Sequence, residues 1–265
     1  MSYWVILVTW VLVGLLIGSF LNVVIYRGPK MWNLVESDSP GNLVSPRSYC
    51  PSCKAPIKRI NMIPLLGYIM LHGKCASCSA SISLRYPLVE LLGAAAAVIA
   101  TILFGFTVTA ALAALFIWTL IALSFIDAET GFLPDALTIP LLALGIVANA
   151  IDLFATLPNA LIGATAGYLI FRLIGAVFQR LRGLEGLGQG DAKLLGALGA
   201  WLGWQALAPL VFAGAVLALA AVGTMRLSGK TVSNETPIPF GPALAGAGAI
   251  AMILNGLHLP ANIWN

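Results

Sequence analysis

Long apolar runs, separated by short polar segments, make up most of the chain. The first run covers residues 3–25 and holds 23 residues without a charge, enough for a helix to cross a bilayer. After one larger polar segment, seven further runs follow, at about 88–106, 108–126, 136–155, 159–179, 192–206, 208–225 and 239–257. Backbone in lipid must satisfy its hydrogen bonds internally, which favours helices. The pattern therefore predicts an all-α polytopic membrane protein with about eight transmembrane helices.

The composition supports a membrane protein and argues against a soluble one. Of the 265 residues, 60% are hydrophobic and only 9% are charged, whereas about 25% charged is usual in soluble domains. We therefore expect the lipid bilayer as a partner. The net charge of +4 could suggest nucleic acid, but basic residues of membrane proteins gather in cytosolic loops, so no nucleic-acid partner is expected. The first apolar run is too long for a cleavable signal and lacks its basic start.

The positions of the basic residues predict the orientation. Residues 27–87 form the largest polar segment and hold eight of the 14 Lys and Arg residues. With the N-terminus outside, all 14 fall in cytosolic loops or at cytosolic helix ends. Fusing 192–225 into one span would move Arg226 and Lys230 outside, so we expect two spans there. Both are short and rich in Gly and Ala, which suits either close helix packing or a water-filled notch between the helices.

Four cysteines in the 27–87 segment form two matched pairs. They are Cys50 with Cys53 and Cys75 with Cys78, and 21 residues separate the pairs. This spacing is one residue above the usual window for a four-thiolate zinc site, and the eight residues from each first cysteine agree at five positions. Disulfides are disfavoured in a reducing cytosol, and inert buried thiols would not come as matched pairs. We therefore expect structural Zn²⁺, which supplies folding energy to a segment with little core.

These features divide the chain into three expected parts. Residues 1–26 are the first transmembrane helix, and residues 27–87 are a small cytosolic zinc-knuckle domain inserted after it. Residues 88–265 are a seven-helix membrane domain, which carries the acids that could do chemistry.

Two aspartates stand at the ends of apolar runs, where an acid is costly to bury. Asp191 follows Gly188-Gln189-Gly190 and precedes an apolar stretch, and Asp127 directly follows the run that ends at Ile126. They are 64 residues apart with two apolar segments between them, so the chain crosses the membrane and returns. We therefore expect both acids at the same face. The alternative for Asp191 is an N-cap, which binds free amide hydrogens at a helix start.

Paired carboxylates carry the chemistry of aspartic proteases. Two of them within about 4 Å repel by roughly 4 kcal/mol at an effective dielectric near 20, or about three pKa units. One then keeps a proton while the other is ionised, so the pair can activate water and polarise a peptide carbonyl. A third acid, Asp135, follows Pro134, and we interpret it as an N-cap, with a catalytic role as the alternative. On the N-cap interpretation, Asp135→Asn keeps much of the activity.

Six ordered segments resemble the bacterial type IV prepilin peptidases, which are GxGD-type membrane aspartic proteases and N-methyltransferases. The segments are GSFLNVVIYR (18–27), NMIPLLGYIMLHGKC (61–75), SLRYPLVELL (83–92), FIDAETGFLPDALTIPLL (125–142), LGQGDAKLLGALGAWLGW (187–204) and IPFGPALAGAG (238–248). The paired cysteines belong to the same resemblance. The family's two catalytic aspartates match Asp127 and Asp191.

The resemblance implies two activities and a location. Such enzymes remove the short basic leader of type IV prepilins or type II secretion pseudopilins after a glycine. They then methylate the new N-terminal residue with S-adenosylmethionine as methyl donor. The implied location is the bacterial inner membrane, with the catalytic face toward the cytosol. The chain shows no glycine-rich nucleotide fingerprint for the methyl donor, so its residues are unassigned and the 27–87 segment is the first place to look.

Two other classes of protein would use the same residues differently. A proton-coupled membrane transporter would use Asp127 and Asp191 as relay carboxylates, but these acids stand at helix ends rather than at mid-membrane. A non-catalytic zinc-bearing scaffold of a secretion machine would use them only as helix caps. Cleavage of a prepilin by the purified protein separates all three classes.

Overall fold

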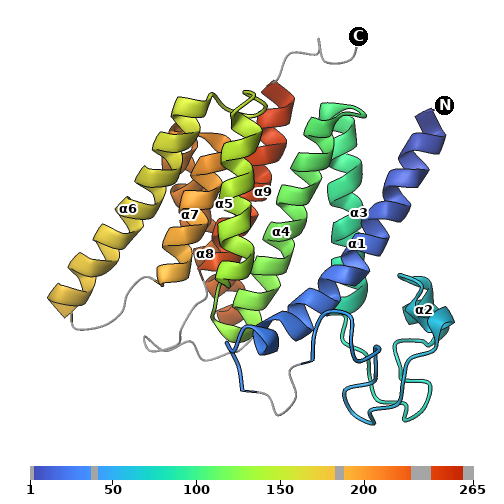
Figure 1. The fold of residues 1–265 in the computed structure, drawn as a ribbon. Helices are drawn as coiled ribbons and strands as arrows, with labels where there is room; N and C mark the ends of the chain where they lie inside the picture. Colours follow the sequence, from blue (N-terminus) through green and yellow to red (C-terminus); the bar gives the residue numbers. More distant parts are fainter. Residues whose placement is uncertain (1–2, 37–40, 183–187, 228–239, 259–265) are drawn as a thin grey trace. The chain divides into compact units, whose positions relative to one another are not determined.

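The computed structural model describes residues 3–36, 41–182, 188–227 and 240–258 (Figure 1). In these ranges the chain is helical, and its β-structure is confined to two isolated bridges. The α-helices are α1 (Tyr3–Met31), α2 (Leu66–Met70), α3 (Arg85–Phe104), α4 (Val108–Thr130), α5 (Asp135–Asn149), α6 (Leu157–Arg182), α7 (Gln189–Leu202), α8 (Leu207–Leu227) and α9 (Gly241–His258). Two short 3-10 helices are η1 (Arg59–Met62) and η2 (Trp204–Ala206).

Within the described ranges, five helices are long and apolar enough to cross a membrane, namely α1, α3, α4, α6 and α8. This confirms a multi-pass, all-α membrane protein. Each of the eight predicted apolar runs coincides with one α-helix, but α5, α7 and α9 are shorter than the others. That all eight helices cross the membrane stays a prediction. Lys230, one of the residues used to predict the orientation, lies outside the described residues.

The stretch 192–225 is broken into two helices, as predicted. Gly203 stands between α7 and η2 with a φ of 81°, a backbone conformation that glycine adopts without steric cost. The backbone N–H of Gly203 still donates to the carbonyl of Gly199 at 2.9 Å, which closes the last turn of α7. The chain then starts α8 as a new helix.

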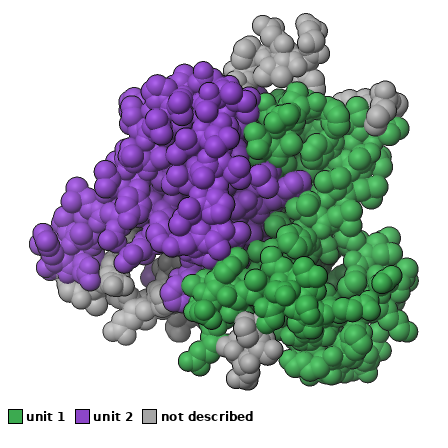
Figure 2. All heavy atoms as spheres, viewed as in Figure 1, with its two compact units in different colours: residues 1–114 green, residues 115–265 purple. Residues whose placement is uncertain are grey.

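The chain divides into two compact units, residues 1–114 and 115–265 (Figure 2). In the first unit, α1 and α3 cross where both helices carry small residues. A Cβ added to Gly14 would lie 2.6 Å from the backbone of Ala94, and a Cβ on Gly18 would lie 2.6 Å from the backbone of Glu90. Because these glycines have no side chain, the backbones of the two helices touch, as is common for helices that pack in lipid. The expected division into three parts stays a prediction.

Among its described residues, the 27–87 segment holds the last turn of α1, the start of α3, η1 and α2, and little other regular structure. Its contacts with the helices of the first unit include polar ones: Arg27 donates to the carbonyl of Asn42 at 2.9 Å, and the buried Glu90 of α3 accepts from the backbone N–H of Leu65 at 2.8 Å. No residue of η1 is buried. Such a segment has few apolar contacts of its own with which to offset the entropy of folding.

In the second unit, α6 and α7 pack through glycines. A Cβ on Gly163 would collide with the carbonyl oxygen of Gly199, and a Cβ on Gly199 would collide with that of Gly163. A Cβ on Gly167, one turn along α6, would lie 2.8 Å from the carbonyl oxygen of Leu195. Of the two sequence interpretations, close packing therefore holds between α7 and α6, and Figure 1 shows these helices side by side.

The far end of α7 is fixed to α5 by buried polar groups. Trp201 is fully buried, and its indole N–H donates to the carbonyl of Leu141 at 2.7 Å. Asn149, also fully buried, donates to the carbonyls of Ala200 and Trp201 at 2.8 and 2.9 Å. Its side-chain oxygen accepts from the backbone N–H groups of Phe154 and Ala155. All four hydrogen-bonding positions of Asn149 are thus used.

Candidate active site and metal site

Asp127 lies one turn before the end of α4. The helix stops because Gly131, with a φ of 71°, takes the left-handed conformation, and its N–H donates to the carbonyl of Asp127 at 2.8 Å. Asp127 is buried, with 6% of its surface exposed. Its carboxylate accepts a hydrogen bond from the backbone N–H of Gly241, the first residue of α9. The positive end of a helix dipole thus faces this acid.

Asp191 is the third residue of α7, not its N-cap. The N-cap is Gly188, and the Asp191 carboxylate reaches back to accept from the backbone N–H of Gly188. This is the second half of a capping box, in which an acid at the third helical position binds the N-cap amide. The N-cap interpretation of Asp191 is therefore wrong by three positions, although the acid does bind the start of its helix. Asp191 is half-buried.

The two acids lie at the same end of the second unit, as their separation in sequence predicts. They are close enough for the charge of Asp127 to act on Asp191. Leu133 lies beside both: a Cβ on Gly190 would lie 2.8 Å from the Cβ of Leu133, and a Cβ on Gly241 would lie 3.2 Å from its Cδ1. The buried Leu133 is thus wedged between the starts of α7 and α9. Glycines at both positions make room for it.

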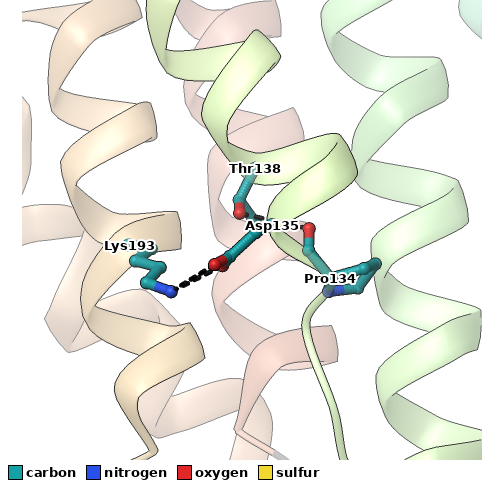
Figure 3. A network of polar contacts seen from close by, with 4 residues as sticks. All are labelled: Pro134, Asp135, Thr138 and Lys193. Atoms are coloured by element: carbon teal, nitrogen blue, oxygen red, sulfur yellow. Dashed lines mark hydrogen bonds and ion pairs between the residues drawn. The ribbon is translucent and has the colours of Figure 1, made fainter. Parts of the chain in front are cut away.

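Asp135 makes an ion pair instead of capping α5 (Figure 3). It is the first residue of α5, the N-cap is Pro134, and no side chain makes the capping hydrogen bond. Both carboxylate oxygens of Asp135 accept from Nζ of Lys193, at 2.6 and 2.7 Å. The N-cap interpretation of Asp135 is therefore wrong, because proline supplies the fixed φ of the helix start and leaves the aspartate free to pair across to α7.

A cavity of about 90 Å³ lies beside Gly188. Arg172 and Gln179 of α6 line it together with Gln189 of α7, and Phe171 gives it an apolar wall. Since the N–H of Gly188 binds Asp191, the cavity adjoins the loop that holds this acid. Its lining offers both hydrogen-bond donors and acceptors to a polar group.

The four cysteines come together in the first unit. Their sulfur atoms all lie within 4.8 Å of one another, and the Sγ atoms of Cys50 and Cys78 are 3.9 Å apart. Backbone N–H groups of Cys53 and Ser52 lower the pKa of the Cys50 thiol to about 6, and N–H groups of Ser77 and Cys78 lower the pKa of Cys75. The other thiols raise the pKa of Cys78 to about 12, so the fit to a tetrahedral metal ion rests on the four sulfur donors and their mutual distances.

The sequence repeat around the cysteines is also a repeat of the backbone. In each copy the N–H of the first cysteine donates to the carbonyl five residues later, Cys50 to Ala55 at 2.9 Å and Cys75 to Ala80 at 2.8 Å. The residue four positions after that cysteine has a positive φ, 61° at Lys54 and 59° at Ser79. The two knuckles are therefore the same turn built twice.

Two residues of the aspartate site were not predicted from the sequence. Gly241 and Leu133 both fall in segments that carry the family resemblance, but nothing in their local sequence showed that Gly241 contacts Asp127 or that Leu133 packs against Gly190 and Gly241. The only usable signal was Gly241-Pro242, because proline in a first turn is typical of a helix start, where free N–H groups could face an acid.

Comparisons with known proteins agree along the chain. Residues 12–104 match the Bacterial Peptidase A24 N-terminal domain, and residues 114–223 match the Type IV leader peptidase family. The chain is similar to prepilin leader peptidase/N-methyltransferases of Pseudomonas aeruginosa (46% identity over 92% of this chain and 88% of the relative), Aeromonas hydrophila (46%, 91% and 88%) and Neisseria gonorrhoeae (42%, 91% and 88%). No solved structure matches the chain significantly.

Proposed function

This chain belongs to the prepilin leader peptidase/N-methyltransferase family, and we propose that it cleaves the leader from a prepilin with Asp127 and Asp191 as its catalytic carboxylates. The observation that carries the proposal is that both acids stand at one end of the second unit, where Leu133 packs against Gly190, the neighbour of Asp191, and against Gly241, which contacts Asp127. Two carboxylates that share an apolar site ionise one at a time, which gives a base and an acid in the same place.

The two acids divide the work of peptide hydrolysis between them. The ionised carboxylate takes a proton from water while the water oxygen bonds to the scissile carbonyl carbon, and the protonated carboxylic acid gives its proton to the carbonyl oxygen. The tetrahedral intermediate then breaks its C–N bond, and the leaving nitrogen receives a proton from the acid that took one from water. The backbone N–H of Gly241 holds the Asp127 carboxylate in place through these steps.

The place of the dyad suits a substrate that is itself anchored in the membrane. Both acids stand at helix ends, Asp127 in the last turns of α4 and Asp191 in the first turn of α7. A prepilin or pseudopilin whose apolar helix lies in the bilayer would present the glycine before its scissile bond at that depth. We infer that this end faces the cytosol of a bacterium, at the inner membrane, where a basic leader would be attracted to the ionised dyad.

The second activity of the family is methyl transfer. When bound, S-adenosylmethionine would supply the methyl group for the new N-terminal amine. The 27–87 segment, the largest polar part of the chain, is the first place to look for its site. The four cysteines of that segment would hold structural Zn²⁺, and their mutual distances within 4.8 Å support this assignment. Nothing among the relatives supports a proton-coupled transporter.

Purified protein, a prepilin with a basic leader, and mass spectrometry of the product test the proposal. We expect a product shortened at a glycine, with Asp127→Asn and Asp191→Asn each reducing kcat by about a thousandfold or more. Methyl transfer to a pilin without its leader should survive both changes, which also shows that the variants fold. Normal cleavage by both single variants would refute the dyad assignment.

A further inference from the structure

The ion pair between Lys193 and Asp135 joins the starts of two helices beside the proposed dyad. Lys193 follows Asp191 by two residues in the first turns of α7, and Asp135 is the first residue of α5. One ammonium group binds both carboxylate oxygens, at 2.6 and 2.7 Å (Figure 3). The two residues are 58 positions apart in the chain, so the contact depends on how α5 and α7 pack.

The pair complements a neutral attachment at the other end of the same two helices. There, Asn149 and the indole of Trp201 bind α5 to α7 through buried hydrogen bonds. A helix held at one end can still tilt at the other. At the end that carries Asp191, the Lys193–Asp135 pair fixes how far α7 stands from α5.

The position of the α5 start also places Leu133. This residue precedes Asp135 by two positions and is wedged against Gly190 of α7 and Gly241 of α9. Gly190 adjoins Asp191 in the chain, and Gly241 donates to the carboxylate of Asp127. A shift of the α5 start would therefore be passed through Leu133 to both acids.

We propose that Lys193 and Asp135 are a positioning pair that sets the separation of Asp127 and Asp191. This inference rests on the proposed peptidase function and assigns neither residue a contact with substrate. The pair is partly exposed, with 31% and 53% of the two side chains accessible, so its loss should affect stability little. Catalysis is far more sensitive, because a shift of about 1 Å in a reacting group can cost about a hundredfold in rate.

The test compares five variants in the full-length protein with prepilin as substrate. We expect Lys193→Met and Asp135→Ala each to lower kcat by about tenfold or more while KM changes by less than about twofold. The double variant should be no slower than the slower single variant, because both changes remove one interaction. Lys193→Arg and Asp135→Asn keep a donor and an acceptor, so each should retain at least about a third of the wild-type kcat.

Two controls separate positioning from a general loss of structure. Arg226→Met removes a cation from the exposed end of α8 in the same unit and should leave kcat unchanged. The midpoint of thermal unfolding in detergent should stay within about 2 °C of the wild type for every variant. If Lys193→Met proves unstable, Asp135→Lys combined with Lys193→Asp rebuilds the pair in reverse and should recover kcat.

Several outcomes would overturn the inference. Wild-type kcat in Lys193→Met and Asp135→Ala would show that the pair is dispensable. A rise in KM alone would make the pair a leader-binding site instead, and no recovery with arginine at 193 or with the reversed pair would show a purely structural role. In all three cases the loss of cleavage in Asp127→Asn and Asp191→Asn still supports the proposed function. Absence of cleavage by the wild type would refute the function and the inference together.

Discussion

Gly241 donates its backbone N–H to the carboxylate of Asp127. Because Gly241 has no side chain, it also leaves room for that carboxylate. A Cβ at position 241 would lie 2.5 Å from Oδ2 of Asp127 and 2.9 Å from its Cγ. Both distances are shorter than a van der Waals contact. The first turn of α9 thus binds one acid of the proposed dyad only because this residue has no side chain, so the site depends on a helix that contributes no acid.

We predict that Gly241→Ala lowers peptidase kcat by about tenfold or more, because the methyl group must displace the Asp127 carboxylate. Gly246→Ala is the matched control on the same helix, where a Cβ would make an ordinary contact of 3.6 Å with Leu217. The measurement is steady-state cleavage of a prepilin, with circular dichroism to compare helix content. Equal activity of the two variants would mean that Asp127 tolerates displacement.

Gly199→Ala should destabilise the protein by about 1–3 kcal/mol, because its Cβ would meet the backbone of Gly163 rather than a side chain that could move. Gly223→Ala on α8 is the control. There, a Cβ meets nothing within 4 Å, so the better helix propensity of alanine should stabilise the protein slightly. Thermal unfolding in detergent measures both, and a neutral Gly199→Ala would show that α6 and α7 can separate at little cost.

Asn149→Leu should cost about 3 kcal/mol or more of stability, because it leaves the carbonyls of Ala200 and Trp201 and two backbone N–H groups buried without partners. The comparison is Asn159→Leu, which removes one exposed hydrogen bond, to Trp204 at 3.2 Å, and should change stability by about 0.5 kcal/mol. Equal effects in a denaturant titration would contradict the assignment of Asn149 as the link between α5 and α7.

Cys75→Ser should release the metal, since a serine hydroxyl replaces one of four thiolates. Elemental analysis of the purified protein is expected to show one Zn²⁺ per wild-type chain and little in the variant. Proteases should then cleave the 27–87 segment of the variant faster, as they should in wild-type protein treated with a strong chelator. Ser77→Ala keeps the N–H that donates to Cys75 at 3.4 Å and should keep the metal.

The features that could be predicted from the sequence depend on a local pattern of residues or on the number of apolar runs between two positions. Uncharged runs such as 3–25 are helices because only a helix satisfies its own backbone in lipid. Two helices, α5 and α6, lie between Asp127 and Asp191, as the two apolar runs predicted, and both acids stand at one end of the second unit. The repeat around Cys50 and Cys75 predicted two equal knuckles, and the backbone shows them. Each of these inferences needs only a few dozen residues at a time.

The features that were missed depend on which residues meet in space. The helix that carries Asp191 begins one residue after Gly188, and a shift of that start decides between an N-cap and the third helical position. Asp135 has the sequence context of a cap, and its partner Lys193 is 58 residues away. Contacts of this kind follow from the angle and distance at which α5 and α7 pack, which no local pattern encodes.

The shortness of α7 has a consequence for how water would reach the proposed dyad. Its 14 residues rise by about 21 Å, about 9 Å less than the hydrocarbon thickness of a typical bilayer. Neighbouring helices rather than lipid cover α7, because Ala192 and every residue from Leu194 to Leu202 are buried. If the second unit spans a bilayer as proposed, the 23-residue α4 is long enough to cross it, and the turns that α7 lacks would leave room for water above its first turn. Water, the second reactant of the proposed hydrolysis, would then reach Asp191 through the protein and not through lipid.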